Sequence, residues 1–228
     1  MNPAREEPFW SYEDLALFIG ALLPCAAIAY YSVRPFHHLS RGVQTVAGNF
    51  VLYLLALGVL YILVARRYDR PLWRSLGFTF QFRGAWICVI AGPPLAIGLA
   101  ALGALLHAPE STSIQSLITD RTSLVVVVLF AVLIGPIFEE LIFRGFLLPL
   151  LARSLGPGLG IVLTAVPFGL LHYVTYGWVW QTILVIGIAG VAFGYARVRT
   201  GSTVASVMLH MGYNGMLFVG FLLQRWMQ

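Results

Sequence analysis

Two glutamates and an arginine lie close together inside an apolar stretch of the sequence that runs on to Leu151. An ionised side chain in the middle of a bilayer costs roughly 2.5 to 3.5 kcal/mol, so such a cluster points to a functional requirement. On a helix Glu140 and Arg144 are i,i+4 neighbours that can neutralise each other, whereas Glu139 points about 100° away. The pattern therefore predicts one structural carboxylate, Glu140, and one carboxylate that is available for chemistry, Glu139.

An alternative is that this helix ends at the membrane surface, with its charges among the lipid headgroups. The residues after Arg144 stay apolar for about another two turns, which disfavours this interpretation.

Three further polar side chains stand inside apolar stretches. His172 follows Pro167 and Phe168, while His210 and Asn214 share one helix face at i,i+4 spacing. Each alone is typical of a hydrogen-bonded packing residue. A rise of 1.5 Å per residue puts Glu139 about 18 Å, His172 about 20 Å and His210 about 10 Å from the same side of the membrane. The three side chains could therefore face one cavity, entered from the cytoplasm.

The composition is that of a polytopic membrane protein and excludes a soluble one. Hydrophobic residues make up 59% of the 228, charged residues 10%, and the mean hydropathy is +0.85. The net charge of +5 comes from arginines in short loops, which positive-inside topology explains, so nucleic-acid binding is not indicated. We expect the lipid bilayer as a partner and no nucleic acid.

Stretches long enough to cross a bilayer, about 20 residues each, predict an all-α polytopic membrane protein. We expect a bundle of about seven transmembrane helices, with eight possible, around a polar intramembrane cavity. Residues 1–228 would form a single transmembrane domain, with 123–224 as the core that carries the chemistry. The predicted spans are Tyr12–Val33, Val43–Ala65, Gly84–Leu106, Ser123–Leu151, Leu159–Tyr173, Trp178–Ala196 and Thr203–Gln224.

The orientation follows from the arginines. With seven spans, nine arginines fall on the side of the N-terminus and four on the other, and Arg144 lies inside a span. The positive-inside rule then predicts a multi-pass protein of the cell membrane with a cytoplasmic N-terminus.

Taken together, three motifs resemble the signature of the CPBP family of intramembrane endopeptidases, which includes the type II CAAX prenyl endopeptidases and the Abi proteins. The resemblance extends over Ile134 to Gly215 in the family's order and spacing. The motifs are Glu139-Glu140-x-x-x-Arg144, Phe168-x-x-x-His172 and His210-x-x-x-Asn214.

The resemblance implies an intramembrane protease that acts on a protein or peptide substrate, whose identity and prenylation it does not give. The implied catalytic residues are Glu139, Glu140, His172, His210 and Asn214, with Arg144 and Phe168 in supporting positions. Chemistry is consistent with these roles. Glu139 suits a general base that takes a proton from water, His172 can hold that water, and His210 with Asn214 can donate hydrogen bonds to the oxygen of a tetrahedral intermediate.

Two alternatives remain open. Glu139, His172 and His210 could instead bind zinc, since two histidines and one carboxylate with an open position form a hydrolytic site, although we favour a reaction without a cofactor.

A proton-coupled transporter would also use buried charges, and Gly92-Pro93-Pro94 would suit one of its broken helices. The sequence shows neither a G-x-S-x-G stretch nor an H-E-x-x-H stretch.

Overall fold

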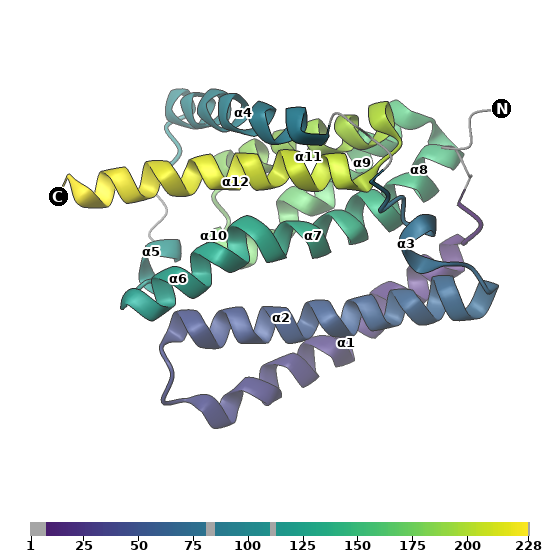
Figure 1. Ribbon diagram of the computed structural model, residues 1–228, viewed down its shortest axis with the longest axis horizontal. Coiled ribbons are helices and arrows are strands. Elements are labelled where there is room, and N and C mark those ends of the chain that lie inside the picture. The colour runs from purple at the N-terminus through teal and green to yellow at the C-terminus, as the bar shows by residue number, and fades with distance from the viewer. Residues whose placement is uncertain (1–7, 81–84, 110–112, 228) are drawn as a thin grey trace.

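The computed structural model describes residues 8–80, 85–109 and 113–227, and throughout these ranges the regular structure is helical (Figure 1). The elements in chain order are α1 (Tyr12–Val33), η1 (Arg34–Phe36), α2 (Arg41–Leu60), η2 (Tyr61–Arg66), α3 (Leu72–Ser75), α4 (Ala85–Leu105), α5 (Ser113–Leu117), α6 (Arg121–Leu129), η3 (Phe130–Ile134), α7 (Gly135–Glu140), η4 (Leu141–Leu147), α8 (Leu148–Leu155), α9 (Pro157–Leu171), α10 (Tyr173–Tyr176), α11 (Trp180–Thr200) and α12 (Thr203–Trp226).

Within the described residues, six helical segments are long and apolar enough to cross a membrane. They are Tyr12–Phe36, Arg41–Arg66, Trp86–Leu105, Arg121–Leu155, Trp180–Thr200 and Thr203–Trp226, and the shorter apolar helix Pro157–Leu171 accompanies them. These helices confirm the prediction of an all-α polytopic membrane protein. The predicted start of the third span, Gly84, lies outside the described residues.

The segment Arg121–Leu155 contains two stretches of π-helix, η3 and η4, on either side of α7. Pro136 stands in the first turn of α7 and Pro149 in the first turn of α8. A proline has no N–H and cannot continue the i→i−4 hydrogen bonds. Each π segment therefore ends directly before a helical turn in which one backbone hydrogen bond is missing. Glu139 and Glu140 therefore lie at the border between an α-helical turn and a widened one.

Donors from other parts of the chain bond to the backbone carbonyls of η4. Trp10 Nε1 donates to the carbonyl of Phe146 at 3.1 Å, and Arg197 Nε donates to the carbonyl of Arg144 at 3.2 Å. The Trp10 side chain is buried and stacks on Phe146. Because backbone groups inside a membrane protein need internal partners, these contacts fix the irregular segment that follows the glutamates.

Helices α4 and α12 lie side by side, with their backbones in contact (Figure 1). A Cβ atom on Gly92 would lie 2.3 Å from the backbone nitrogen of Tyr213, and one on Gly212 would lie 2.2 Å from the carbonyl oxygen of Val89. Small residues allow membrane helices this close approach. Helix α4 continues through Pro93 and Pro94, so Gly92-Pro93-Pro94 is not a helix break of the kind a transporter would use.

Gly212→Ala should destabilise the protein because its new methyl group would overlap the backbone of α4. Overpacking of this kind typically costs about 1 to 3 kcal/mol, which should lower the melting temperature in detergent by several degrees. Gly220→Ala is the matched control on the same helix, since nothing lies within 4 Å of its Cβ position. Equal melting of both variants and the wild type would contradict the close helix crossing.

Candidate active site

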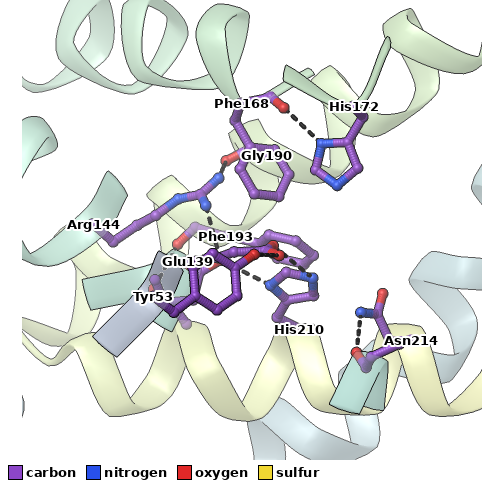
Figure 2. A network of polar contacts seen from close by, with 12 residues as sticks. Tyr53, Glu139, Arg144, Phe168, His172, Gly190, Phe193, His210 and Asn214 are labelled. Atoms are coloured by element: carbon purple, nitrogen blue, oxygen red, sulfur yellow. Dashed lines mark hydrogen bonds and ion pairs between the residues drawn. The ribbon is translucent and has the colours of Figure 1, made fainter. Parts of the chain in front are cut away.

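Glu140 lies at the centre of a buried polar network, of which Figure 2 labels Arg144 and His210. Its side chain is 0% exposed, and its Oε1 accepts hydrogen bonds from Arg144 Nη1 at 2.8 Å and from His210 Nδ1 at 2.9 Å. The i,i+4 pair that the sequence indicates is therefore present. Since Glu140 is closed off from solvent and already engaged by two cationic or polar groups, it is poorly placed to accept a proton from water.

Arg144, also fully buried, connects this carboxylate to the neighbouring helix α11. Its Nη2 donates to the carbonyl of Gly190 at 2.8 Å, so the guanidinium forks between two acceptors on different helices. The Cζ atom lies 4.4 Å from the ring centroid of Phe168 and 5.4 Å from that of Phe193. Phe168, the first residue of the second motif, thus contacts the guanidinium of the first motif through a cation–π interaction.

His210 stands on α12 between the two glutamates. Its ring stacks on Phe193 with centroids 4.4 Å apart, and its Nδ1 faces Glu140. A carboxylate paired with Arg144 can only accept, so the hydrogen bond assigns a proton to Nδ1. The other ring nitrogen, Nε2, lies 3.9 Å from Glu139 Oε2. His210 thus bonds to one glutamate and turns its second nitrogen toward the other.

Glu139 differs from its neighbour in both contacts and exposure. Its side chain is 20% exposed, and its Oε1 accepts a hydrogen bond from the Tyr53 hydroxyl at 2.7 Å. Its Oε2 faces His210 Nε2 across the 3.9 Å gap, which is longer than a hydrogen bond. Oε2 of Glu139 therefore takes part in no hydrogen bond among the described residues, and the side chain is partly open to other molecules.

His172 caps the end of α9. Its Nδ1 lies 2.7 Å from the carbonyl oxygen of Phe168, and because a carbonyl only accepts, Nδ1 carries the proton. The Nε2 atom is then left with its lone pair. Figure 2 shows the His172 ring beside Phe168, with no drawn contact to Glu139 or His210.

Asn214 lies one turn beyond His210 on α12, and its side chain is engaged elsewhere. Its Nδ2 donates to the carbonyl of Ala131 at 2.8 Å, which ties α12 to the π segment η3 (Figure 2). The role of Asn214 as a donor to a tetrahedral intermediate stays a prediction, and it would require the second hydrogen of the amide.

Tyr53 is the site residue that sequence reasoning missed. Tyrosines in membrane proteins are usually explained as interfacial anchors near span ends. The signal that could have found it is its place near the middle of the predicted span Val43–Ala65, where a buried hydroxyl needs a partner.

The alternative zinc site would require Glu139, His172 and His210 to lie close together. Over residues 8–80, 85–109 and 113–227, no three His, Cys, Asp or Glu side chains gather closely enough to hold a metal ion. Glu139, His172 and His210 are thus not gathered as a three-ligand set in this structure, and we derive no step through a metal.

Arg144→Lys should lower stability although it keeps the positive charge. An ammonium group is a compact point charge and cannot fork to Glu140 and Gly190 while stacking on Phe168. Loss of one buried, charge-assisted hydrogen bond predicts destabilisation of about 1.5 to 3 kcal/mol, measured by thermal unfolding in detergent. Arg225→Lys, at an exposed position near the end of α12, is the control and should melt like the wild type. Unchanged melting of Arg144→Lys would contradict the forked contact.

Comparison with known proteins supports the motif analysis. Residues 121–216 match the family described as type II CAAX prenyl endopeptidase Rce1-like. No curated protein and no solved structure gives a significant match to the chain. A match to this family implies a protease, and therefore a protein or peptide substrate. The predicted resemblance to the CPBP family is confirmed by this match of residues 121–216 to the model of the Rce1-like type II CAAX prenyl endopeptidases.

Proposed function

We propose that this protein is an intramembrane endopeptidase of the CAAX-protease type, in which Glu139 activates water in a cavity open to the cytoplasm. The observation that carries the proposal is the difference between the adjacent glutamates. Glu140 is 0% exposed, with Arg144 and His210 both bonded to its Oε1 and with its Oε2 buried without a partner, whereas Glu139 is 20% exposed and among the described residues is bonded through Oε1 to Tyr53. The family match and the arginine distribution support the proposal.

The attack on the peptide bond begins with a water between Glu139 and His172. Nε2 of His172 accepts a hydrogen bond from this water, while Glu139 Oε2 takes up its proton. The water oxygen forms a bond to the carbonyl carbon, and the electron pair of the C=O bond moves onto the carbonyl oxygen. The pair then returns, the C–N bond breaks, and the proton passes from Glu139 to the leaving nitrogen.

His210 is placed to stabilise the negative oxygen formed during this attack. A hydrogen on its Nε2 can donate to the tetrahedral oxygen, as the second hydrogen of the Asn214 amide can.

Glu139→Gln and Glu140→Gln should have different effects. Glu139→Gln removes the proton acceptor and keeps its volume, and general-base catalysis contributes about 10²- to 10⁴-fold, so turnover should fall at least about a hundredfold with melting unchanged. Glu140→Gln should mainly lower the melting temperature because it weakens the pair with Arg144. Both quantities can be measured with a quenched, farnesylated peptide that ends in a CAAX sequence. Equal losses of activity would overturn the assignment of Glu139 as the base.

A strong chelator should leave the cleavage of this peptide largely intact, because the proposed reaction uses protein side chains and water alone. The measurement compares initial rates before and after exhaustive dialysis against the chelator, with a known zinc protease treated in parallel. Complete loss of activity that stoichiometric zinc restores would decide for the metal-dependent alternative.

A further inference from the structure

Tyr53 reaches the proposed base from a part of the chain that the family match does not include. It stands on α2, before the matched residues 121–216 begin. Its hydroxyl oxygen lies 2.7 Å from Glu139 Oε1, across 86 positions of sequence. A carboxylate can only accept, so the phenol donates this hydrogen bond. An N-terminal helix therefore contributes a polar group to the site.

The aromatic ring of Tyr53 is held between two phenylalanines of the segment that carries Glu139. The ring centroid lies 5.8 Å from that of Phe130 with an interplanar angle of 9°, and 5.3 Å from that of Phe138 at 21°. Stacking with two rings restricts the Tyr53 ring to one orientation, which in turn fixes the hydroxyl. Phe138 precedes Glu139 directly in sequence, so the same contact fixes the backbone of the base.

Oε1 of Glu139 is bonded to Tyr53, and the neighbouring polar groups of the site lie elsewhere. His210 on α12 faces Oε2, while Arg144 bonds to Glu140 and Gly190 and His172 lies against the carbonyl of Phe168. In the portion of the chain for which the structure gives positions, the Tyr53 hydroxyl is the one hydrogen-bond donor to the Glu139 side chain. The carboxylate would otherwise be free to rotate about its terminal bond.

We propose that Tyr53 is a positioning residue that anchors Glu139 Oε1 and so leaves Oε2 as the oxygen that accepts the proton from water. This inference rests on the proposed function of Glu139 as the base. A base must stand within hydrogen-bond reach of the proton it takes, and small misplacements of such groups are costly. Helix α2 then completes an active site whose other side chains come from the matched segment.

Tyr53→Phe tests the role because it removes only the hydroxyl and keeps the stacked ring. With the farnesylated CAAX peptide, kcat should fall about ten- to a hundredfold, as expected for loss of one hydrogen bond to a charged group, while KM and the melting temperature stay close to those of the wild type. Tyr61→Phe removes a hydroxyl from the exposed side chain that follows α2, and it should leave all three quantities unchanged.

A double mutant distinguishes action through Glu139 from any other role. If Tyr53 works by positioning the base, adding Tyr53→Phe to Glu139→Gln should lower the residual rate by less than twofold. Losses that multiply, a raised KM with unchanged kcat, or equal rates for Tyr53→Phe and Tyr61→Phe would each overturn the proposal.

An infrared measurement without substrate keeps this proposal separate from the proposed function. Carboxylate bands that vanish in Glu139→Gln belong to Glu139, and they should shift in Tyr53→Phe and stay in place in Tyr61→Phe. Bands that do not shift in Tyr53→Phe would overturn the positioning role. A band shift together with full activity of Glu139→Gln would refute Glu139 as the base, and with it the catalytic role of Tyr53, while confirming the contact between the two side chains.

Discussion

A fully buried ion pair between Glu140 and Arg144 holds the centre of this molecule together. Breaking a buried pair by removal of one partner typically costs about 3 to 5 kcal/mol, because the remaining charge is left uncompensated. Here the pair also joins three segments, since Arg144 bonds to Gly190 of α11 and His210 of α12 bonds to Glu140. Glu140, the second glutamate of the motif, is thereby paired with Arg144. Oε2 of Glu139, the first glutamate, takes part in no hydrogen bond among the described residues.

The irregular backbone beside the glutamates depends on contacts from both ends of the chain. Pro136 and Pro149 each begin a helix that follows a π segment, and the carbonyls of η4 receive donors from Trp10 and Arg197. In an apolar environment such groups must be satisfied by the protein itself. The N-terminal residues and α11 thus support the geometry of a motif that lies far from them in sequence.

The segment with family resemblance and the preceding helices contribute in different ways. Residues 121–216 carry the groups to which the proposed hydrolysis assigns roles, namely Glu139, Glu140, Arg144, His172 and His210. The earlier helices supply contacts to them, with the Tyr53 hydroxyl on Glu139 and the backbone of α4 against α12 at Gly212. The motifs therefore carry the proposed chemistry, and the N-terminal half contacts the side chains and the helix that would perform it.

The sequence by itself determined the membrane class, the helical fold and the pairing of Glu140 with Arg144. Hydropathy follows from composition, and an i,i+4 pair follows from the helical repeat alone, so both can be read locally. The spacing of His210 and Asn214 likewise predicts a shared face, but not that Asn214 would bond to Ala131.

Only the tertiary structure decided which helix faces meet. It brought the Tyr53 hydroxyl to Glu139, placed His210 against Glu140, and kept α4 continuous through Pro93 and Pro94. Periodicity tells which residues share a face of one helix. Which faces pack together depends on side-chain volumes, glycine contacts and backbone irregularities across the whole bundle, and these have no local signature in the sequence.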